Sequence, residues 1–141
     1  KEIQANMYAA RLNQYMNEER PWLKPDLSVY SLSQQLNISR NHLTQVLNER
    51  INKNFYEFVN GYRVEEAKRM MNDSKFSHLT LTGIGLEAGF KSKTAFNLNF
   101  KKQTGYTPSE WKKLHQHNPD TPPQAIRQES PLKDVRSART G

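Results

Sequence analysis

The chain has 141 residues, with 21 Lys or Arg against 14 Asp or Glu, so its formal net charge is +7. This length allows one domain with its own core or two very small ones, and the positive charge favours a polyanionic partner without identifying it. Because the chain contains no cysteine, a disulfide framework, a zinc ribbon and a cysteine nucleophile are excluded. No apolar run approaches the roughly 20 residues that span a bilayer, and no signal peptide is recognisable.

The first predicted element is a helix over residues 5–19. Its apolar stripe, at helical spacing, consists of Tyr8, Leu12, Tyr15 and Met16. Pro21 and Pro25 then end this helix and enclose a short irregular link. Three apolar residues of the link are expected to dock on the core, namely Trp22, Leu23 and Leu27.

A helix-turn-helix unit is predicted over about residues 31–48. Ser31 and Gln34 have the spacing of a capping box, which predicts the start of a short helix. Ser39 is the expected cap of a second helix. The inner face of this second helix consists of Leu43, Val46 and Leu47, with Ile38 filling the turn. Asn52 is expected to end the segment in a left-handed conformation, which Asn tolerates better than most residues.

A connecting helix is predicted over about residues 54–72, and the pattern makes it the longest of the chain. Asn54 and Glu57 have the spacing of its N-terminal capping box. Apolar residues keep a helical period along it, namely Phe55, Phe58, Val59, Tyr62, Ala67, Met70 and Met71. Its length and central position suit a rod between two lobes.

A second helix-turn-helix unit is predicted over about residues 80–104, followed by one more helix. Its expected turn and cap residues are Thr80, Gly89, Phe90, Ser92 and Gly105, and its inner apolar residues are Phe96 and Phe100. Gly85 costs about 1 kcal/mol in a helix relative to Ala, so we expect it to permit close approach of a neighbouring helix. The last helix starts with Thr107 as cap, Pro108 in the first turn and Glu110 three residues after the cap.

The sequence thus divides into a helical domain over residues 1–116 and a tail over residues 117–141. The tail has four Pro scattered among Gln, Ser, Arg and Asp and few apolar residues, so it is predicted to be mostly disordered. Its charges nearly cancel, which places the positive excess in the helical domain. Because the chain starts at Lys1 and not at Met, we expect a fragment of a longer protein, with further sequence before Lys1.

The two units repeat one another at a constant offset of 53 positions. The matched pairs are Ser39 with Ser92, Leu43 with Phe96, Leu47 with Phe100, Asn54 with Thr107, Glu57 with Glu110, and Phe58 with Trp111. Two tandem helix-turn-helix units on a small basic chain point to DNA reading, because each unit can present one helix to a major groove.

The outward faces of the two candidate reading helices carry different chemistry. The first presents Arg40, Asn41, Thr44, Gln45 and Asn48, where Asn and Gln can pair with adenine and Arg with phosphate or guanine. The second presents Lys93, Thr94, Asn97 and Lys101, with Lys91 in the preceding turn. Residues 91–113 contain six lysines and one acid, an excess that suits phosphate contacts. An ordinary solvated polar face remains the alternative, more so for the first helix.

No other arrangement of residues indicates a catalytic, cofactor or metal site. The aromatic residues have the spacing of core packing, which is favoured over base stacking. His115 and His117 alone make a weak metal site. Neither a phosphate loop nor a paired-carboxylate or Ser/His/Asp set is recognisable, so we expect no enzyme activity, no cofactor and no bound metal.

These elements in this order resemble the DNA-binding domain of the AraC/XylS family of bacterial transcription regulators. The resemblance covers roughly residues 5–115 and is strongest from Ile84 to Trp111, with a further match over residues 58–68. It implies an all-α fold of seven helices in two lobes joined by the long central helix. It also implies two reading helices in successive major-groove segments about 34 Å apart.

Matching by position assigns roles to individual residues. Base reading falls to Asn41, Thr44 and Gln45 in the first helix and to Lys93, Thr94 and Asn97 in the second. Contacts to the DNA backbone fall to Arg40, Arg63, Lys91, Ser92 and Lys101. Leu98 stands where the family often has a polar or basic reader, so it touches a thymine methyl or the second unit binds mainly through phosphates.

The sequence therefore predicts the DNA-binding output domain of a cytoplasmic transcription factor, with double-stranded DNA as its partner. RNA polymerase is a candidate second partner, and a separate sensor or dimerisation region is expected before the helical domain. The alternative function is a helical protein-interaction module whose basic charge is incidental.

Overall fold

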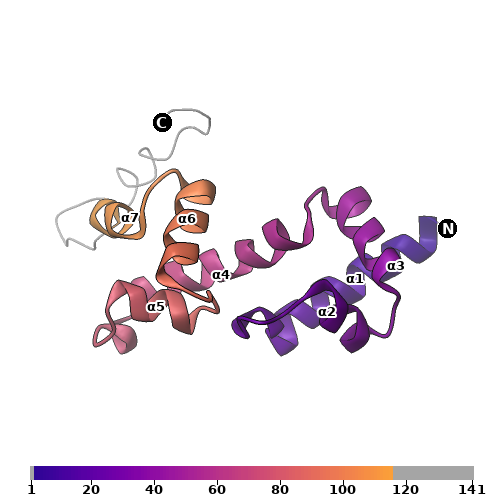
Figure 1. Cartoon of the computed structure of the whole chain (residues 1–141), viewed down its shortest axis with the longest axis horizontal. Coiled ribbons are helices and arrows are strands. Elements are labelled where there is room, and N and C mark those ends of the chain that lie inside the picture. Colours follow the sequence, from indigo (N-terminus) through magenta and orange to yellow (C-terminus); the bar gives the residue numbers. More distant parts are fainter. Residues whose placement is uncertain (1, 116–141) are drawn as a thin grey trace.

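A computed structural model describes residues 2–115, and in this range the fold is all-α, with one lobe on each side of helix α4 (Figure 1). The α-helices of this range are α1 (Glu2–Glu19), α2 (Val29–Leu36), α3 (Arg40–Val46), α4 (Phe55–Met71), α5 (Leu81–Glu87), α6 (Lys93–Thr104) and α7 (Pro108–Leu114). Shorter helical segments are η1 (Pro21–Leu23), η2 (Leu47–Ile51) and η3 (Ser74–Phe76). The predicted seven-helix, two-lobed fold is confirmed, whereas the tail predicted over residues 117–141 lies outside the described residues.

Lobe one comprises residues 2–54 together with the N-terminal half of α4. Its core gathers apolar side chains from α1, η1, α2, α3, η2 and α4, namely Leu12, Met16, Trp22, Leu32, Leu36, Leu43, Leu47, Phe58 and Val59. Leu12 and Met16 have no exposed surface, which confirms the apolar stripe predicted for the first helix. At 18 residues α1 is one residue longer than α4, so the prediction that the connecting helix is the longest was wrong.

Helix α2 starts three residues before the predicted position. Its cap is Ser28, which has extended backbone and accepts a hydrogen bond from the Ser31 amide, while the Ser31 hydroxyl accepts from the Ser28 amide. Ser31 is thus the third helical residue of a capping box and not the cap, and Gln34 takes no part in the box. Leu32 and Leu36, four residues apart on one face of α2, both enter the core.

The turn of lobe one and the end of its reading helix follow the expected backbone. Asn37 ends α2 in the left-handed region, and Ser39 caps α3 by accepting from the His42 amide at 3.0 Å. After Val46 the chain widens into the π-helical segment η2, which the sequence pattern did not indicate. Asn52 ends this segment with a φ of 67°, as predicted.

Lobe two comprises the C-terminal half of α4 and residues 74–115. Its core consists of Val64, Ala67, Met70, Ile84, Ala88, Phe90, Phe96, Phe100 and Trp111. The cap residues predicted for α5, α6 and α7 are confirmed, because the side chains of Thr80, Ser92 and Thr107 each accept from the amide three residues later. Each lobe thus builds its own core on one half of α4, which holds the two reading helices on a common element.

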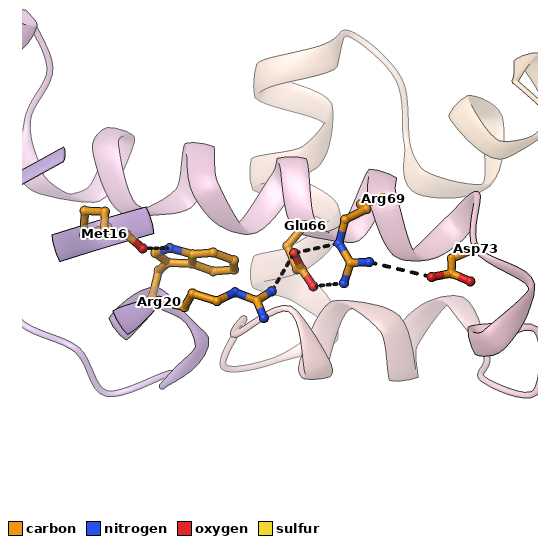
Figure 2. Close-up of polar contacts among 6 residues, drawn as sticks. Met16, Arg20, Glu66, Arg69 and Asp73 are labelled. Atoms are coloured by element: carbon orange, nitrogen blue, oxygen red, sulfur yellow. Dashed lines mark hydrogen bonds and ion pairs between the residues drawn. The ribbon is translucent and has the colours of Figure 1, made fainter. Parts of the chain in front are cut away.

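A polar cluster on α4 lies where lobe one meets lobe two (Figure 2). Glu66 is 9% exposed and binds Arg69 on its own helix and, at 2.9 Å, the Arg20 side chain that follows α1. The hydrogen bond from Arg69, assisted by Arg20, lowers the pKa of Glu66 despite the opposing effect of burial. Arg20 also lies over the ring of Trp22, whose indole nitrogen donates to the Met16 carbonyl.

Candidate nucleic-acid interface

The first candidate reading helix, α3, packs its apolar side on the core of lobe one and exposes its polar side. Leu43 and Val46 are buried in lobe one, with at most 3% of their surface exposed. Asn41, Thr44 and Gln45 are all exposed, as expected for base-reading residues. The capped start at Ser39 fixes where the helix begins, and the core residues fix its rotation about its own axis.

Two contacts orient side chains on this polar face. The Gln45 amide donates to the Glu49 carboxylate one turn later, at 3.3 and 3.5 Å to its two oxygens. The Arg40 guanidinium lies over the ring of Tyr30 on α2, with 5.7 Å between its central carbon and the ring centre. Glu49 was not among the predicted site residues, although its i, i+4 spacing from Gln45 indicates the contact. A carboxylate beside Gln45 can accept from the amino group of cytosine and repels phosphate.

The second candidate reading helix, α6, shows the same division. Phe96 and Phe100 are buried in lobe two, whereas Lys93, Thr94 and Lys101 are exposed and Asn97 is half-buried. Lys91 and Ser92 are exposed in the preceding turn, and the Ser92 hydroxyl accepts from the Ala95 amide. Leu98 is 67% exposed on the same helix, which leaves a large apolar side chain on an otherwise polar surface.

Gly85 on α5 sets how closely α6 packs on lobe two. A Cβ atom at this position would lie 2.3 Å from Cδ2 of Phe96, far inside van der Waals contact. The expectation that Gly85 permits close approach of a neighbouring helix is therefore confirmed. The contact places the Phe96 side of α6 directly against α5 and leaves the polar face exposed.

Arg63 does not lie on either polar face, in contrast to its expected place among the DNA-backbone contacts. It is 8% exposed, and its guanidinium donates to the carbonyls of Trp22 and Lys24 and to the side chain of Asn60. Burial lowers the pKa of Arg63, yet an arginine remains cationic in proteins. Because its donors are directed at partners inside the protein, we withdraw Arg63 from the candidate contacts to DNA.

The two lobes differ in charge. Outside α4, residues 2–54 contain six Lys or Arg and five Asp or Glu, whereas residues 74–115 contain seven Lys and two Glu. Most of the lysines in lobe two are exposed on α6, α7 and the turn before α6, namely Lys91, Lys93, Lys101, Lys102, Lys112 and Lys113. The stronger attraction for a polyanion therefore comes from lobe two.

Residues 2–115 contain neither a candidate metal site nor a candidate membrane-spanning helix. No three His, Cys, Asp or Glu side chains in this range are grouped so that they could hold a metal ion. His115 stacks on Trp111, while His117 lies outside the described residues. None of the helices in this range has the length and apolar character needed to cross a bilayer.

Helices α3 and α6 each start at a capping residue, pack on the core of their own lobe and expose a polar face. This arrangement defines a tandem helix-turn-helix DNA-binding domain. A family model described as a helix-turn-helix domain matches residues 32–114. The chain is 34% identical over 87 residues to an uncharacterized HTH-type transcriptional regulator of Staphylococcus aureus, a match that covers 62% of this chain and 11% of that protein. The chain therefore belongs to this helix-turn-helix family, of the AraC type.

Solved structures have the same fold. The C-terminal domain of AraT, a response regulator from Geobacillus stearothermophilus, superposes with a TM-score of 0.68 at 21% identity, over 82% of this chain and 92% of that one. The DNA-binding domain of the global transcriptional factor AdpA, solved in complex with a target DNA, gives 0.66 at 18% identity, over 80% and 97% of the two chains. The chain spans about a tenth of the length of the first curated relatives that it matches (11%).

Proposed function

We propose that the domain reads double-stranded DNA at two adjacent boxes, with α3 and α6 in successive major-groove segments about one helical turn apart. The observation that carries this proposal is the repeated design of the two helices. Each starts at a serine cap, each is fixed by two or more buried apolar residues, and each leaves a polar face exposed. Neither face is occupied by another part of residues 2–115, so both are free to meet a ligand.

Base reading is assigned to polar residues on the outward face of each helix, all exposed except the half-buried Asn97. On α3 the candidate residues are Asn41, Thr44 and Gln45, and on α6 they are Lys93, Thr94 and Asn97. Asn and Gln side chains can pair with adenine through two hydrogen bonds, Lys can donate to guanine, and Thr can contact a thymine methyl. Leu98 is a second candidate for a contact with a thymine methyl, because this methyl is the apolar group that the major groove offers to an exposed apolar side chain.

Phosphate contacts are assigned to Arg40, Lys91, Ser92 and Lys101, which surround the two polar faces. Such contacts supply affinity and orientation without sequence preference. Because lobe two is the more basic lobe, we infer that it provides most of the salt-dependent affinity. Lobe one, with its amide-rich helix, then provides most of the sequence preference.

Selection of binding sites from a random duplex pool, followed by titration at two salt concentrations, tests this function. Two boxes about one turn apart would support the double reader. A strict box for α3 and a loose box for α6 would support the division between the lobes. Weak salt-dependent binding to every duplex would contradict sequence reading and favour the alternative of a helical protein-interaction module.

The role of the domain in a longer regulator is also a proposal. We infer that it is the output domain of a cytoplasmic transcription factor and acts without catalysis. In this arrangement a separate sensor or dimerisation region controls it, and RNA polymerase is a candidate partner on the promoter. A pull-down of RNA polymerase on duplexes with and without the selected boxes tests that contact, and recovery that ignores the boxes would contradict it.

A further inference from the structure

A chain of hydrogen bonds crosses the molecule where the lobes meet. On α4, Arg63 donates from Nε to the Trp22 carbonyl at 2.8 Å and from Nη2 to the Lys24 carbonyl at 2.9 Å. Both carbonyls belong to the link between α1 and α2 in lobe one. The third donor, Nη1, bonds to Oδ1 of Asn60 at 3.1 Å, one turn earlier on α4. One buried guanidinium thus bonds to two lobe-one carbonyls, and that of Lys24 also accepts from the Leu27 amide.

The same chain of bonds continues into the second reading helix. Asn60 donates from Nδ2 to Oδ1 of Asn99 on α6 at 3.1 Å. Asn99 in turn donates to the Ala95 carbonyl of α6 at 2.9 Å. Asn99 therefore contacts α4, whereas Lys93, Thr94 and Lys101 of the same helix are exposed. The network connects lobe-one backbone to α6 through only two side chains of α4.

The backbone of lobe two also lies directly on the lobe-one link. Gly89, in the turn before α6, has a φ of 111°. A Cβ atom there would lie 2.2 Å from the Trp22 carbonyl oxygen and 3.1 Å from Cα of Leu23. The Trp22 carbonyl thus accepts from Arg63 and lies beside Gly89 at once. The lobes are in direct contact, so α4 is not their only connection.

A rigid connection has a measurable consequence for a protein that binds two boxes. When two modules are joined, the second binds with an effective concentration that is highest if the joint already holds the right geometry. Each added base pair moves one box by about 3.4 Å and rotates it by about 34°. A stiff joint therefore accepts one spacing, whereas a loose joint accepts several at lower affinity.

We propose that Arg63 and Asn99 are positioning residues that fix the separation and relative rotation of α3 and α6, and thereby the single box spacing that the domain accepts. This inference rests on the two-box function proposed above. In this proposal neither Arg63 nor Asn99 contacts DNA. Arg63 acts through the lobe-one carbonyls, and Asn99 acts through Asn60.

The test measures affinity for duplexes in which the selected boxes are separated by the best spacer, by one base pair more or by one base pair fewer. A single-box duplex completes the set. The variants are Arg63→Met and Asn99→Ala. The control is Lys68→Met, because Lys68 pairs with Glu65 on α4 and lies over the Trp111 ring of lobe two, and neither contact reaches lobe one. For the original chain we expect an off-spacing loss of about ten-fold or more. For both variants we expect this loss to shrink to about three-fold or less, with single-box affinity unchanged and Lys68→Met like the original.

The possible failures are distinguishable. If the original chain binds all spacings and the single box equally, the two-box function itself is wrong, and this inference falls with it. If the original chain is selective and Asn99→Ala keeps the same selectivity, only the inference is overturned. Asn99→Ala removes a single half-buried amide, so it decides the question even if Arg63→Met does not fold.

A spectroscopic measurement checks the same proposal without DNA. Because the chain has no cysteine, spin labels can be attached through Asn13→Cys on α1 and Glu87→Cys on α5, both exposed sites. Combining this pair with Asn99→Ala should broaden the distance distribution between the labels, whereas Lys68→Met should leave it unchanged. An equally narrow distribution in the Asn99→Ala background would contradict the positioning role.

Discussion

At the scale of single residues, Gln45 is the sharpest test of base reading. Its side chain is exposed on α3 and held by Glu49, which leaves one amide hydrogen and the amide oxygen for a base. We expect Gln45→Ala to cost about 1–3 kcal/mol in binding at one base position of the selected site and little elsewhere. The measurement is affinity for the selected site and for its single-base variants.

Lys101→Ala is the matched control on α6. It should weaken binding to all sequences alike and reduce the slope of log affinity against log salt by about one unit. Equal loss on every sequence for Gln45→Ala would assign Gln45 to the same class as Lys101 and contradict its base-reading role.

A substitution at Gly85 tests how closely α6, the second candidate reading helix, packs against α5. A methyl group at this position would overlap the Phe96 ring, which is fully buried and has nowhere to move. We expect Gly85→Ala to lower the free energy of unfolding by about 1–3 kcal/mol, measured by denaturant titration.

Gly61, in the middle of α4, provides the control for this prediction. Its nearest foreign atom is Oε1 of Gln103, 3.6 Å from the position of a Cβ, at the end of a flexible side chain. Gly61→Ala should therefore raise the free energy of unfolding by up to about 1 kcal/mol, because Ala favours a helix over Gly. Similar losses for both variants would contradict the close packing at Gly85.

At the scale of elements, the start of α2 distinguishes two possible caps. Ser28 is the cap in the structure, whereas the sequence spacing favoured Ser31 with Gln34 as its partner. Ser28→Ala should cost about 1 kcal/mol in the free energy of unfolding. Gln34→Ala should cost little, because the Gln34 amide bonds only to the exposed hydroxyl of Tyr30. A larger loss for Gln34→Ala in thermal unfolding would favour the start at Ser31.

The caps show which elements could be predicted from sequence. Five other starts, at Ser39, Asn54, Thr80, Ser92 and Thr107, were predicted correctly, because each is a good cap directly before its helical run. At α2 two serines three positions apart both fit, and in the structure Ser28 is the cap, with Ser31 as its capping-box partner. The π-helical η2 was missed because it has no sequence pattern of its own.

At the scale of the whole molecule, the lobes were easier to predict than their junction. Each core follows from a local apolar period, so the two lobes and their reading helices could be predicted from the sequence alone. The partners of Arg63 are backbone carbonyls 39 and 41 positions away, which no local pattern reveals. Matching by position to the family assigns Arg63 a contact to the DNA backbone, whereas in the folded chain its guanidinium bonds to carbonyls of lobe one.

The junction should also make the fold sensitive to acid. Glu66 binds Arg20 of the lobe-one link and Arg69 of α4, and the hydrogen bond from Arg69 is the main reason that its pKa lies below the usual value. A carboxyl group with a lowered pKa in the folded state adds stability that is complete above its unfolded pKa of about 4.3 and is lost as the pH falls through the folded value. We therefore expect the free energy of unfolding to decrease as the pH falls below about 5, in part because Glu66 becomes protonated.

Glu66→Gln isolates this contribution. Because both arginines are partly exposed, with 42% and 52% of their side chains accessible, we expect the variant to be less stable at pH 7 by only about 1–2 kcal/mol. The difference from the original chain should shrink as the pH falls from about 5 through the lowered folded pKa of Glu66, in denaturant titrations at each pH. Glu65→Gln is the control, since Glu65 is 71% exposed and pairs only with Lys68, so it should differ little from the original chain at any pH. A Glu66→Gln deficit that stays constant across this range would mean that Glu66 acts through its shape and hydrogen bonds and not through its charge, and that the acid sensitivity of the junction lies elsewhere.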